Sequence, residues 1–459
     1  LRPALLLFLA IPSVDTSDPV KGVIEQRLDH FNDQDERIIA QHYYFYDPRT
    51  KQDNNRNSMQ SSVEEETPEG DIVLLYIGPH SPLDKNQHKS LLGIPTGVEK
   101  VARSLNAYRF YLEHRFYGQS TVVGRKTCSE KVERFLSIAQ AVEDVNRFIN
   151  VMNDIRELKQ PRWIVVGGDY GGLVALAFRA MYPDASVGAW VSSAPVHFKA
   201  DFSEYATAIE EAYLQMNGSC LDNMKWFTST LRTTECSKTI EARRRYAIAL
   251  PVLFNEMLDL ICDRLEASET NGHFDPNQMF LMLLDNIKDF TDDSSTYNWK
   301  WQQCSELGLF PSHSAQSVFG FRQTLQEQLV DCFETFNIDA AKHVADKRLE
   351  FPETVLEKVT NVLYTNGELD PLISVCSAEE DATRNVRSLV FPGLRHSMDL
   401  HSSIYNMDQL NLAALDQVES VLKEFTAETR AVRSSKSSPI IFHHFLTIIL
   451  LLWASADLL

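Results

Sequence analysis

Short hydrophobic runs alternate with helical patterns over the first 200 residues of the chain and again beyond residue 350. Apolar or aromatic runs predict strands at 38–46, 72–77, 107–112, 163–166, 187–192, 359–365 and 388–391. Apolar positions at helical spacing predict helices over 131–157, 173–181 and roughly 407–425. Strands that alternate with helices favour an α/β fold, with a mostly parallel sheet covered on both faces.

The pattern changes between residues 200 and 350, where strand signals disappear and helical spacing dominates. We therefore predict one α/β core in two parts, 18–200 and 351–430, interrupted by a helical insert over 201–350. Residues 51–69 are polar, charged and aperiodic, which is typical of a surface loop between two strands.

The first 17 residues have the parts of a secretory signal peptide. Arg2 precedes the apolar run Ala4–Ile11, and small or polar residues follow it. The run is too short to cross a bilayer. A buried first strand is the alternative.

A second apolar segment ends the chain. Residues 431–459 begin with a polar linker and continue into the hydrophobic run Phe445–Trp453 with no basic residue after it. This order favours a lipid-anchor signal with attachment at Ser434 or Ser435. A single membrane span and a plain buried tail remain as alternatives.

Composition and charge narrow the class of protein further. Of 459 residues, 44% are hydrophobic and 23% charged, which excludes a disordered chain or a polytopic membrane protein. Sixty-three acidic residues against 44 basic ones leave a net charge of −19. Such a surface repels phosphate backbones, so nucleic acid is not expected as a partner.

The seven cysteines show no C-x-x-C pair, which disfavours a zinc site. In a secreted chain up to three disulfides can form, leaving one thiol, but their pairing cannot be deduced from sequence. Asn217 begins an Asn-Gly-Ser sequon and is the candidate glycosylation site.

The most informative segment is residues 162–176, where an apolar strand enters a glycine-rich turn and then a helix. Glycines flank Asp169 and Tyr170 on both sides, as in the nucleophile elbow of α/β-hydrolases. The backbone N–H of Tyr170, which follows the elbow residue, is the expected oxyanion donor. The spacing does not match G-x-G-x-x-G, so no dinucleotide or other cofactor is predicted.

Two later residues complete the order nucleophile, acid, histidine that such hydrolases use. Asp370 follows a predicted strand in Asn-Gly-Glu-Leu-Asp-Pro, and His396 follows the last predicted strand. Each residue alone is a weak signal. Their order and their positions after strands make Asp370 and His396 candidate triad members.

These motifs resemble the serine carboxypeptidases that include lysosomal Pro-X carboxypeptidase, dipeptidyl peptidase II and thymus-specific serine protease. The matching segments are Gln26–Phe31, Leu112–Ser120, the elbow with its helix through Pro183, Ser192–Val196, Trp301–Cys304, Asn366–Pro371 and the His396 loop. The resemblance implies an α/β-hydrolase core with a helical cap domain, and peptidases of the secretory or lysosomal pathway that act at or next to proline. It also implies that Asp370 and His396 are the triad acid and base.

The elbow departs from that family, because Asp169 stands where the family has serine. A carboxylate that attacked a peptide carbonyl would form a mixed anhydride, and its charge would oppose the developing oxyanion. His396 would lie between two carboxylates and be held as an imidazolium, which cannot act as a base. The loop after Gly78 departs as well, with Pro-His-Ser in place of a Gly- and Glu-rich sequence, and Leu372 replaces the usual Trp.

Three hypotheses follow for a chain of the secretory pathway, whether cell-surface, extracellular or lysosomal. The favoured one is a pseudopeptidase that binds a peptide or protein ligand between core and cap. The second is a retained hydrolase activity, either of the family's peptidase type or with Asp169 as nucleophile toward saturated carbon. The third is an interaction or receptor ectodomain that acts through its surface. Membrane attachment through the tail and a homodimer are further open expectations.

Three other groups are expected to be structural. Glu113-His114-Arg115 is interpreted as a buried ion pair or hydrogen-bonded support beneath the site. Trp299 and Trp301 are expected in the core of the cap. Asp399 is expected to order the His396 loop through turn hydrogen bonds.

Overall fold

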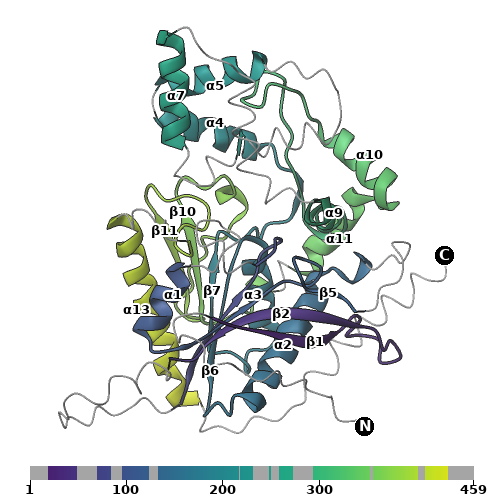
Figure 1. Cartoon of the computed structure of the whole chain (residues 1–459), viewed down its shortest axis with the longest axis vertical. Helices are drawn as coiled ribbons and strands as arrows, with labels where there is room; N and C mark the ends of the chain where they lie inside the picture. Colours follow the sequence, from purple (N-terminus) through teal and green to yellow (C-terminus); the bar gives the residue numbers. More distant parts are fainter. Residues whose placement is uncertain are drawn as a thin grey trace.

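A central sheet with helices on both faces forms the body of the molecule (Figure 1). The computed structural model describes residues 19–48, 70–83, 96–123, 133–216, 218–230, 248–249, 258–271, 293–351, 355–401 and 409–432. The predicted signal peptide, Asn217, Ser434, Ser435 and the terminal hydrophobic tail lie outside the described residues.

The described sheet has nine strands in the order β1-β2-β4-β3-β6-β7-β10-β11, with β5 beside β2. They are β1 (Val20–Arg27), β2 (Ile38–Tyr46), β3 (Ile72–Ile77), β4 (Tyr108–Leu112), β5 (Thr121–Val122), β6 (Arg162–Gly168), β7 (Gly188–Ser192), β10 (Val362–Gly367) and β11 (Val386–Phe391). Strands β4 to β11 along this order are parallel, whereas β2 is antiparallel to both β1 and β4. Strand β1 was not among the predicted elements.

The central strands bury side chains on both faces, and a separate apolar cluster covers each face. Helices α2 (Ile138–Ile155) and α3 (Asp169–Met181) pack on one face, and α1 (Thr96–Ser104) and α13 (Gln409–Val432) pack on the other. Two-sided burial explains why these strands appear in the sequence as continuous apolar runs without alternation. This arrangement is the α/β-hydrolase fold, as the sequence predicts.

Helices inserted between β7 and β10 rise above one end of the sheet (Figure 1). The outer group is α4 (Glu204–Met216), α5 (Gly218–Thr230) and α7 (Leu258–Asn271), which share their own apolar cluster. The inner group is α9 (Asp293–Gln302), the π-helical turn η4 (Gln303–Leu307), α10 (Leu325–Phe336) and α11 (Ala340–Glu350). The expectation that strands are absent here is wrong, since β8 (Lys199–Asp201) and β9 (Gly308–Phe310) form a small parallel sheet.

Polar contacts join the inner group of the insert to the core. The side-chain amide of Asn298 donates to the carbonyl of Phe116 at 2.8 Å, and the indole of Trp301 donates to Leu136 at 3.1 Å. The buried carboxylate of Glu306 accepts the N–H of Ile138, the first residue of α2, at 3.1 Å. A carboxylate there satisfies an otherwise unpaired amide and interacts favourably with the helix dipole.

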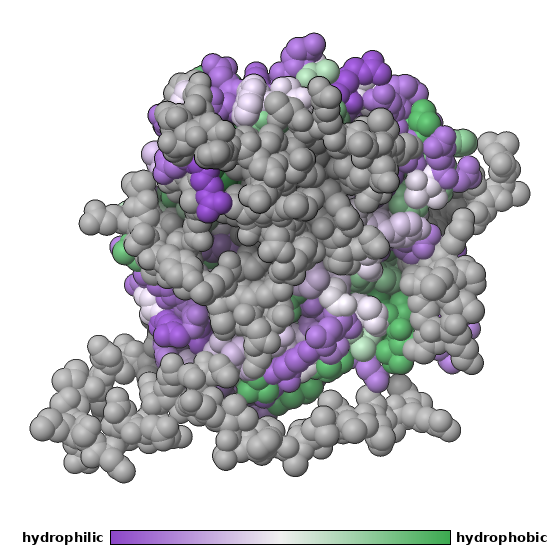
Figure 2. All heavy atoms as spheres, turned by 45° about the horizontal axis from the view of Figure 1, so that its top comes forward, coloured by the Kyte–Doolittle hydropathy of each residue, from purple (hydrophilic) through white to green (hydrophobic). Residues whose placement is uncertain are grey.

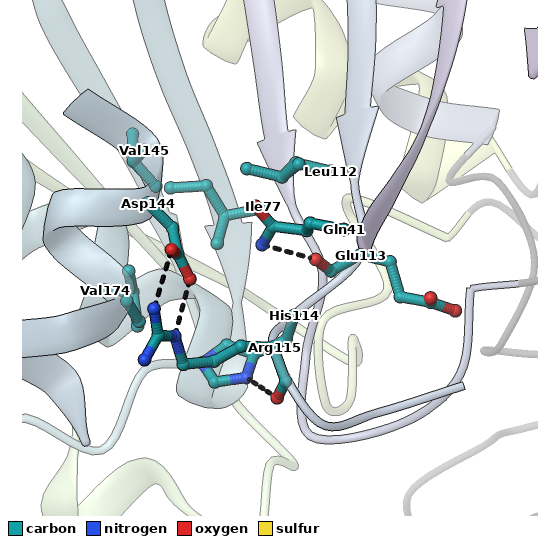
Figure 3. Close-up of a pocket in the computed structure, with 10 residues that line it drawn as sticks. Gln41, Ile77, Leu112, Glu113, His114, Arg115, Asp144, Val145 and Val174 are labelled. Carbon is teal, nitrogen blue, oxygen red and sulfur yellow. Dashed lines mark hydrogen bonds and ion pairs between the residues drawn. The ribbon is translucent and has the colours of Figure 1, made fainter. Parts of the chain in front are cut away.

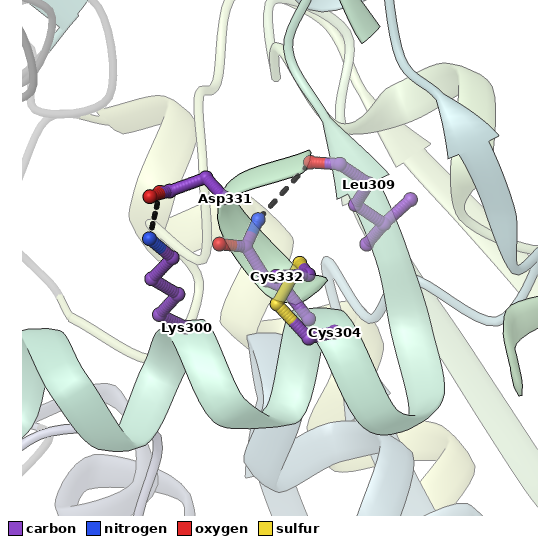
Figure 4. The surroundings of a disulfide bond; sticks show 6 residues. Lys300, Cys304, Leu309, Asp331 and Cys332 are labelled. Atoms are coloured by element: carbon purple, nitrogen blue, oxygen red, sulfur yellow. Dashed lines mark hydrogen bonds and ion pairs between the residues drawn. A yellow bond between two sulfur atoms is a disulfide. The ribbon is translucent and has the colours of Figure 1, made fainter. Parts of the chain in front are cut away.

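Two disulfides lie in the insert, Cys220–Cys262 in the outer group and Cys304–Cys332 in the inner one. Figure 4 shows the second, which links η4 to α10 beside the ion pair of Lys300 and Asp331. Cys376 in the core is a free, buried thiol. The remaining two cysteines lie outside the described residues, so the prediction of a third disulfide stays open.

On the face that Figure 2 shows, hydrophilic and hydrophobic areas alternate among the described residues. No helix in the described ranges combines the length and the apolar character that crossing a bilayer requires.

Candidate functional site

The elbow between β6 and α3 places Asp169 at the end of a central strand in a left-handed backbone conformation, with φ of 51°. A non-glycine residue at positive φ is strained and marks a functional constraint. The flanking glycines make the turn possible. A Cβ at Gly167 would lie 2.3 Å from the backbone of Gly171, and one at Gly171 would lie 2.4 Å from the carbonyl oxygen of Ile77.

Asp370 and His396 meet beside this elbow, although 26 residues separate them. Asp370 follows β10 and His396 follows β11, and adjacent parallel strands bring their carboxyl ends together. The His396 Nδ1–H donates to both carboxylate oxygens at 3.1 Å, and both side chains are buried. The acid–base pair implied by the resemblance is therefore present as a contact.

The carboxylates around His396 shift its pKa upward. Burial alone would lower its pKa, but the carboxylates of Asp370 first, then Asp169 and Asp399, raise the pKa of His396 to about 9. At pH 7 only about one molecule in a hundred then carries the neutral imidazole. This agrees with the imidazolium that the sequence predicts.

A second histidine, His80, also contacts Asp169. Nδ1 of His80 lies 2.9 Å from Oδ2 of Asp169, an ion-pair distance, although the ring N–H is not aligned for a hydrogen bond. Burial opposes ionisation of Asp169, but His80, His396 and the backbone N–H of Tyr170 hold its pKa below the ordinary value. The lowered pKa favours the anionic form of the elbow carboxylate, and the backbone N–H of Tyr170, the expected oxyanion donor, contributes to it.

His80 also links the elbow to the cap. Its ring stacks on the indole of Trp299 in α9, with centroids 4.0 Å apart and planes at 21°. The same indole meets the ring of Tyr170 edge-on at 6.3 Å. Trp299 is therefore a wall of the site and not part of the cap interior, because α9 lies against the core where η4 is anchored. The departure of the loop after Gly78 was the only sequence signal that pointed toward His80.

Asp399 holds the His396 loop through side chains of the sheet, not through turn hydrogen bonds. Its carboxylate accepts from Ser192 at 2.6 Å, from Thr365 at 2.5 Å and from the indole of Trp190 at 3.1 Å. These donors belong to β7 and β10, so the loop is fixed to the two strands that flank the insertion. The sequence could not predict these partners of Asp399, because they are distant from it along the chain.

A buried polar network joins the segment after β4 to helix α2 (Figure 3). The Arg115 guanidinium donates two hydrogen bonds, of 2.6 and 2.8 Å, to the carboxylate of Asp144 in α2. It also donates to the carbonyls of Leu28 and Phe135. His30 Nε2 lies 2.8 Å from the same carboxylate. The prediction of a buried ion pair in this segment is confirmed.

The other two residues of that segment have separate structural roles. Glu113 accepts hydrogen bonds from Ser120 and from the backbone of Leu83, which holds the loop after β3. Burial lowers the pKa of His114 to about 4, so this ring is neutral at physiological pH. A small cavity beside His114 and Arg115 is lined by neither Asp169 nor His396.

Two features of the arrangement bear on acyl transfer to a side chain. Asp169 offers no hydroxyl to deprotonate, and the raised pKa of His396 favours its charged form at pH 7. In the described parts of the chain, no cluster of three His, Cys, Asp or Glu side chains could hold a metal ion.

Comparison with known proteins places the chain in a family. The profile of the serine carboxypeptidase S28 peptidases matches residues 26–265 and 252–418. The chain belongs to the serine carboxypeptidase S28 family. Mouse thymus-specific serine protease is 30% identical over 450 residues, which cover 83% of this chain and 82% of the mouse protein. Human lysosomal Pro-X carboxypeptidase is 22% identical over 473 residues, covering 88% and 89% of the two chains.

Solved α/β-hydrolases resemble the chain more distantly. Proline iminopeptidase of Mycobacterium smegmatis is 12% identical, with a TM-score of 0.37, and the match covers 88% of this chain and 100% of that one. An acetylester hydrolase of Corynebacterium glutamicum is also 12% identical, with a TM-score of 0.44 and coverage of 90% and 97%.

Proposed function

We propose that this chain is a non-catalytic member of the S28 peptidase family, which retains the pocket between core and cap as a binding site for peptides. One observation carries the proposal. The elbow side chain is an anionic carboxylate paired with His80, next to a His396 whose pKa is raised to about 9 by Asp370 and Asp169 against its burial.

Two steps of serine peptidase chemistry, formation of the acyl ester and stabilisation of the oxyanion, are disfavoured at this elbow. No hydroxyl is available to form an acyl ester, and a mixed anhydride with Asp169 would be a far poorer intermediate. The Tyr170 N–H lowers the pKa of Asp169 and so already stabilises one negative charge at the elbow, which makes it a poorer donor for a substrate oxyanion.

Relatives named for lysosomal Pro-X carboxypeptidase activity support a proline-containing peptide as the ligand class. The same names, together with two disulfides in the insert, support a place in the secretory pathway, at the cell surface, outside the cell or in lysosomes.

The test compares the native chain with Asp169→Ser. Both are incubated with a serine-directed fluorophosphonate, an Xaa-Pro dipeptidyl substrate and the tripeptide Ala-Pro-Phe, and binding of Ala-Pro-Phe is followed by calorimetry. We expect the native chain to bind Ala-Pro-Phe without labelling or cleavage. Labelling or peptide turnover by the native chain would overturn the loss of catalysis, and absence of binding would overturn the peptide-binding role.

A further inference from the structure

The loop between β3 and α1 carries a second departure that the elbow alone does not explain. In α/β-hydrolases this loop offers one of the two backbone N–H groups of the oxyanion hole. Here it begins Gly78-Pro79-His80, and proline has no N–H to offer. The loop instead directs an imidazole toward the elbow, with Nδ1 of His80 2.9 Å from Oδ2 of Asp169.

The position of the ring conflicts with that of an acyl substrate. A reacting carbonyl must sit about 3 Å from both the nucleophile and the oxyanion donors. His80 already lies at that distance from the elbow side chain, on the side of the loop that would supply a donor. A carbonyl group and this imidazole cannot occupy the same space.

The cap contacts the ring independently of Asp169. His80 stacks on Trp299 with ring centroids 4.0 Å apart, so the face of the imidazole packs on the cap while Nδ1 lies near Asp169. Trp299 lies in α9, next to Asn298 and Trp301, whose side chains bond to the core backbone. A change at Asp169 alone therefore leaves the ring where it is.

We propose that His80 is a second determinant of this site, which blocks the oxyanion hole from the β3–α1 loop and restricts the pocket to ligands whose carbonyl groups stay outside it. The inference rests on the proposed loss of peptidase function and deepens it. The two residues act together. Asp169 stands where a nucleophilic hydroxyl would be, and the His80 ring fills the space that the acyl group of a substrate would need.

The experiment measures the rate of fluorophosphonate labelling for the native chain, His80→Gly, Asp169→Ser and the double variant Asp169→Ser/His80→Gly. The native chain and His80→Gly lack an elbow serine and should not label. We expect the double variant to label at least about ten-fold faster than Asp169→Ser, because access to an oxyanion hole is worth that factor or more.

Equal rates for the two serine variants, or no labelling of either, would overturn His80 as the barrier. Labelling of the native chain would overturn the proposed function instead, so the two failures are distinguishable. A thermal-unfolding cycle of Asp169→Asn, His80→Gln and the double change provides a check without catalysis. Shifts in Tm that simply add would show that the two side chains do not act as a pair.

Discussion

The charge of His396 offers the most direct check of the site, since it depends on two named carboxylates. In the native chain Asp370, and after it Asp169, outweigh burial and raise the pKa of His396 from 6.5 to about 9. That difference corresponds to about 3 kcal/mol in favour of the imidazolium. We expect Asp370→Asn to lower the pKa of His396 strongly, because burial then opposes the charge with less compensation, and Asp169→Asn to lower it by a smaller amount.

Histidine-selective NMR titration measures this directly, with His396→Gln to assign the signal. A ring that is neutral at pH 7 in the native chain would refute the reasoning. So would an Asp370→Asn variant whose His396 titrates at the native midpoint.

The free energy of unfolding should depend on pH through the protonation of His396. The pKa of His396 is raised in the folded chain, so its stabilisation is complete below about pH 6.5 and is lost as pH rises through about 9. Relative to His396→Gln, the native free energy of unfolding should fall by about 3 kcal/mol across that window. Chemical denaturation at several pH values tests this, and parallel pH profiles for the two chains would contradict it.

Three further predictions concern the framework of the site. Asp144→Asn breaks a fully buried ion pair and should lower the free energy of unfolding by about 3–5 kcal/mol in urea denaturation. The control variant Asp154→Asn changes an exposed residue of the same helix and should have little effect. Equal effects of the two variants would show that the Arg115–Asp144 network does not stabilise the fold. Replacing Cys304 and Cys332 by serine opens a loop of 28 residues and should lower the free energy of unfolding by about 3.5 kcal/mol. Denaturation of the variant is compared with that of the native chain with and without reductant, and an unchanged midpoint would argue against the disulfide. Gly171→Ala puts a Cβ 2.4 Å from a β3 carbonyl oxygen and should cost at least about 2 kcal/mol, so a native Tm for this variant would contradict the elbow geometry.

The sequence was most informative where local pattern and burial agree. Strands β2 and β3 have the predicted bounds. Strand β3 is a continuous apolar run between parallel neighbours, and β2 is marked by its aromatic and aliphatic residues. The elbow was recognisable for the same reason, since a strand, close-packed glycines and a helix follow one another without a gap. Strand β1 was missed because it lies at the sheet edge with exposed positions such as Val23, and its apolar signal is weak.

The sequence predicted which residue types form the site, but only some of the contacts between them. The order of Asp169, Asp370 and His396 and the charge of the imidazolium could be argued from residue types alone. Three contacts could not, namely His80 with Asp169, His80 with Trp299, and Asp399 with the side chains of β7 and β10. Each joins segments tens to hundreds of residues apart, and no local propensity encodes such a distance.

The sequence by itself therefore determined the fold class, the family and the presence of a carboxylate, Asp169, at the elbow, because these depend on residue identity and periodicity. Only the tertiary structure decided which group faces the elbow carboxylate. Asp169 could have paired with His396 alone, and the loop after β3 could have pointed elsewhere. Packing of α9 against the core brings Trp299 over that loop, and the stacked ring of His80 is thereby held against the carboxylate of Asp169.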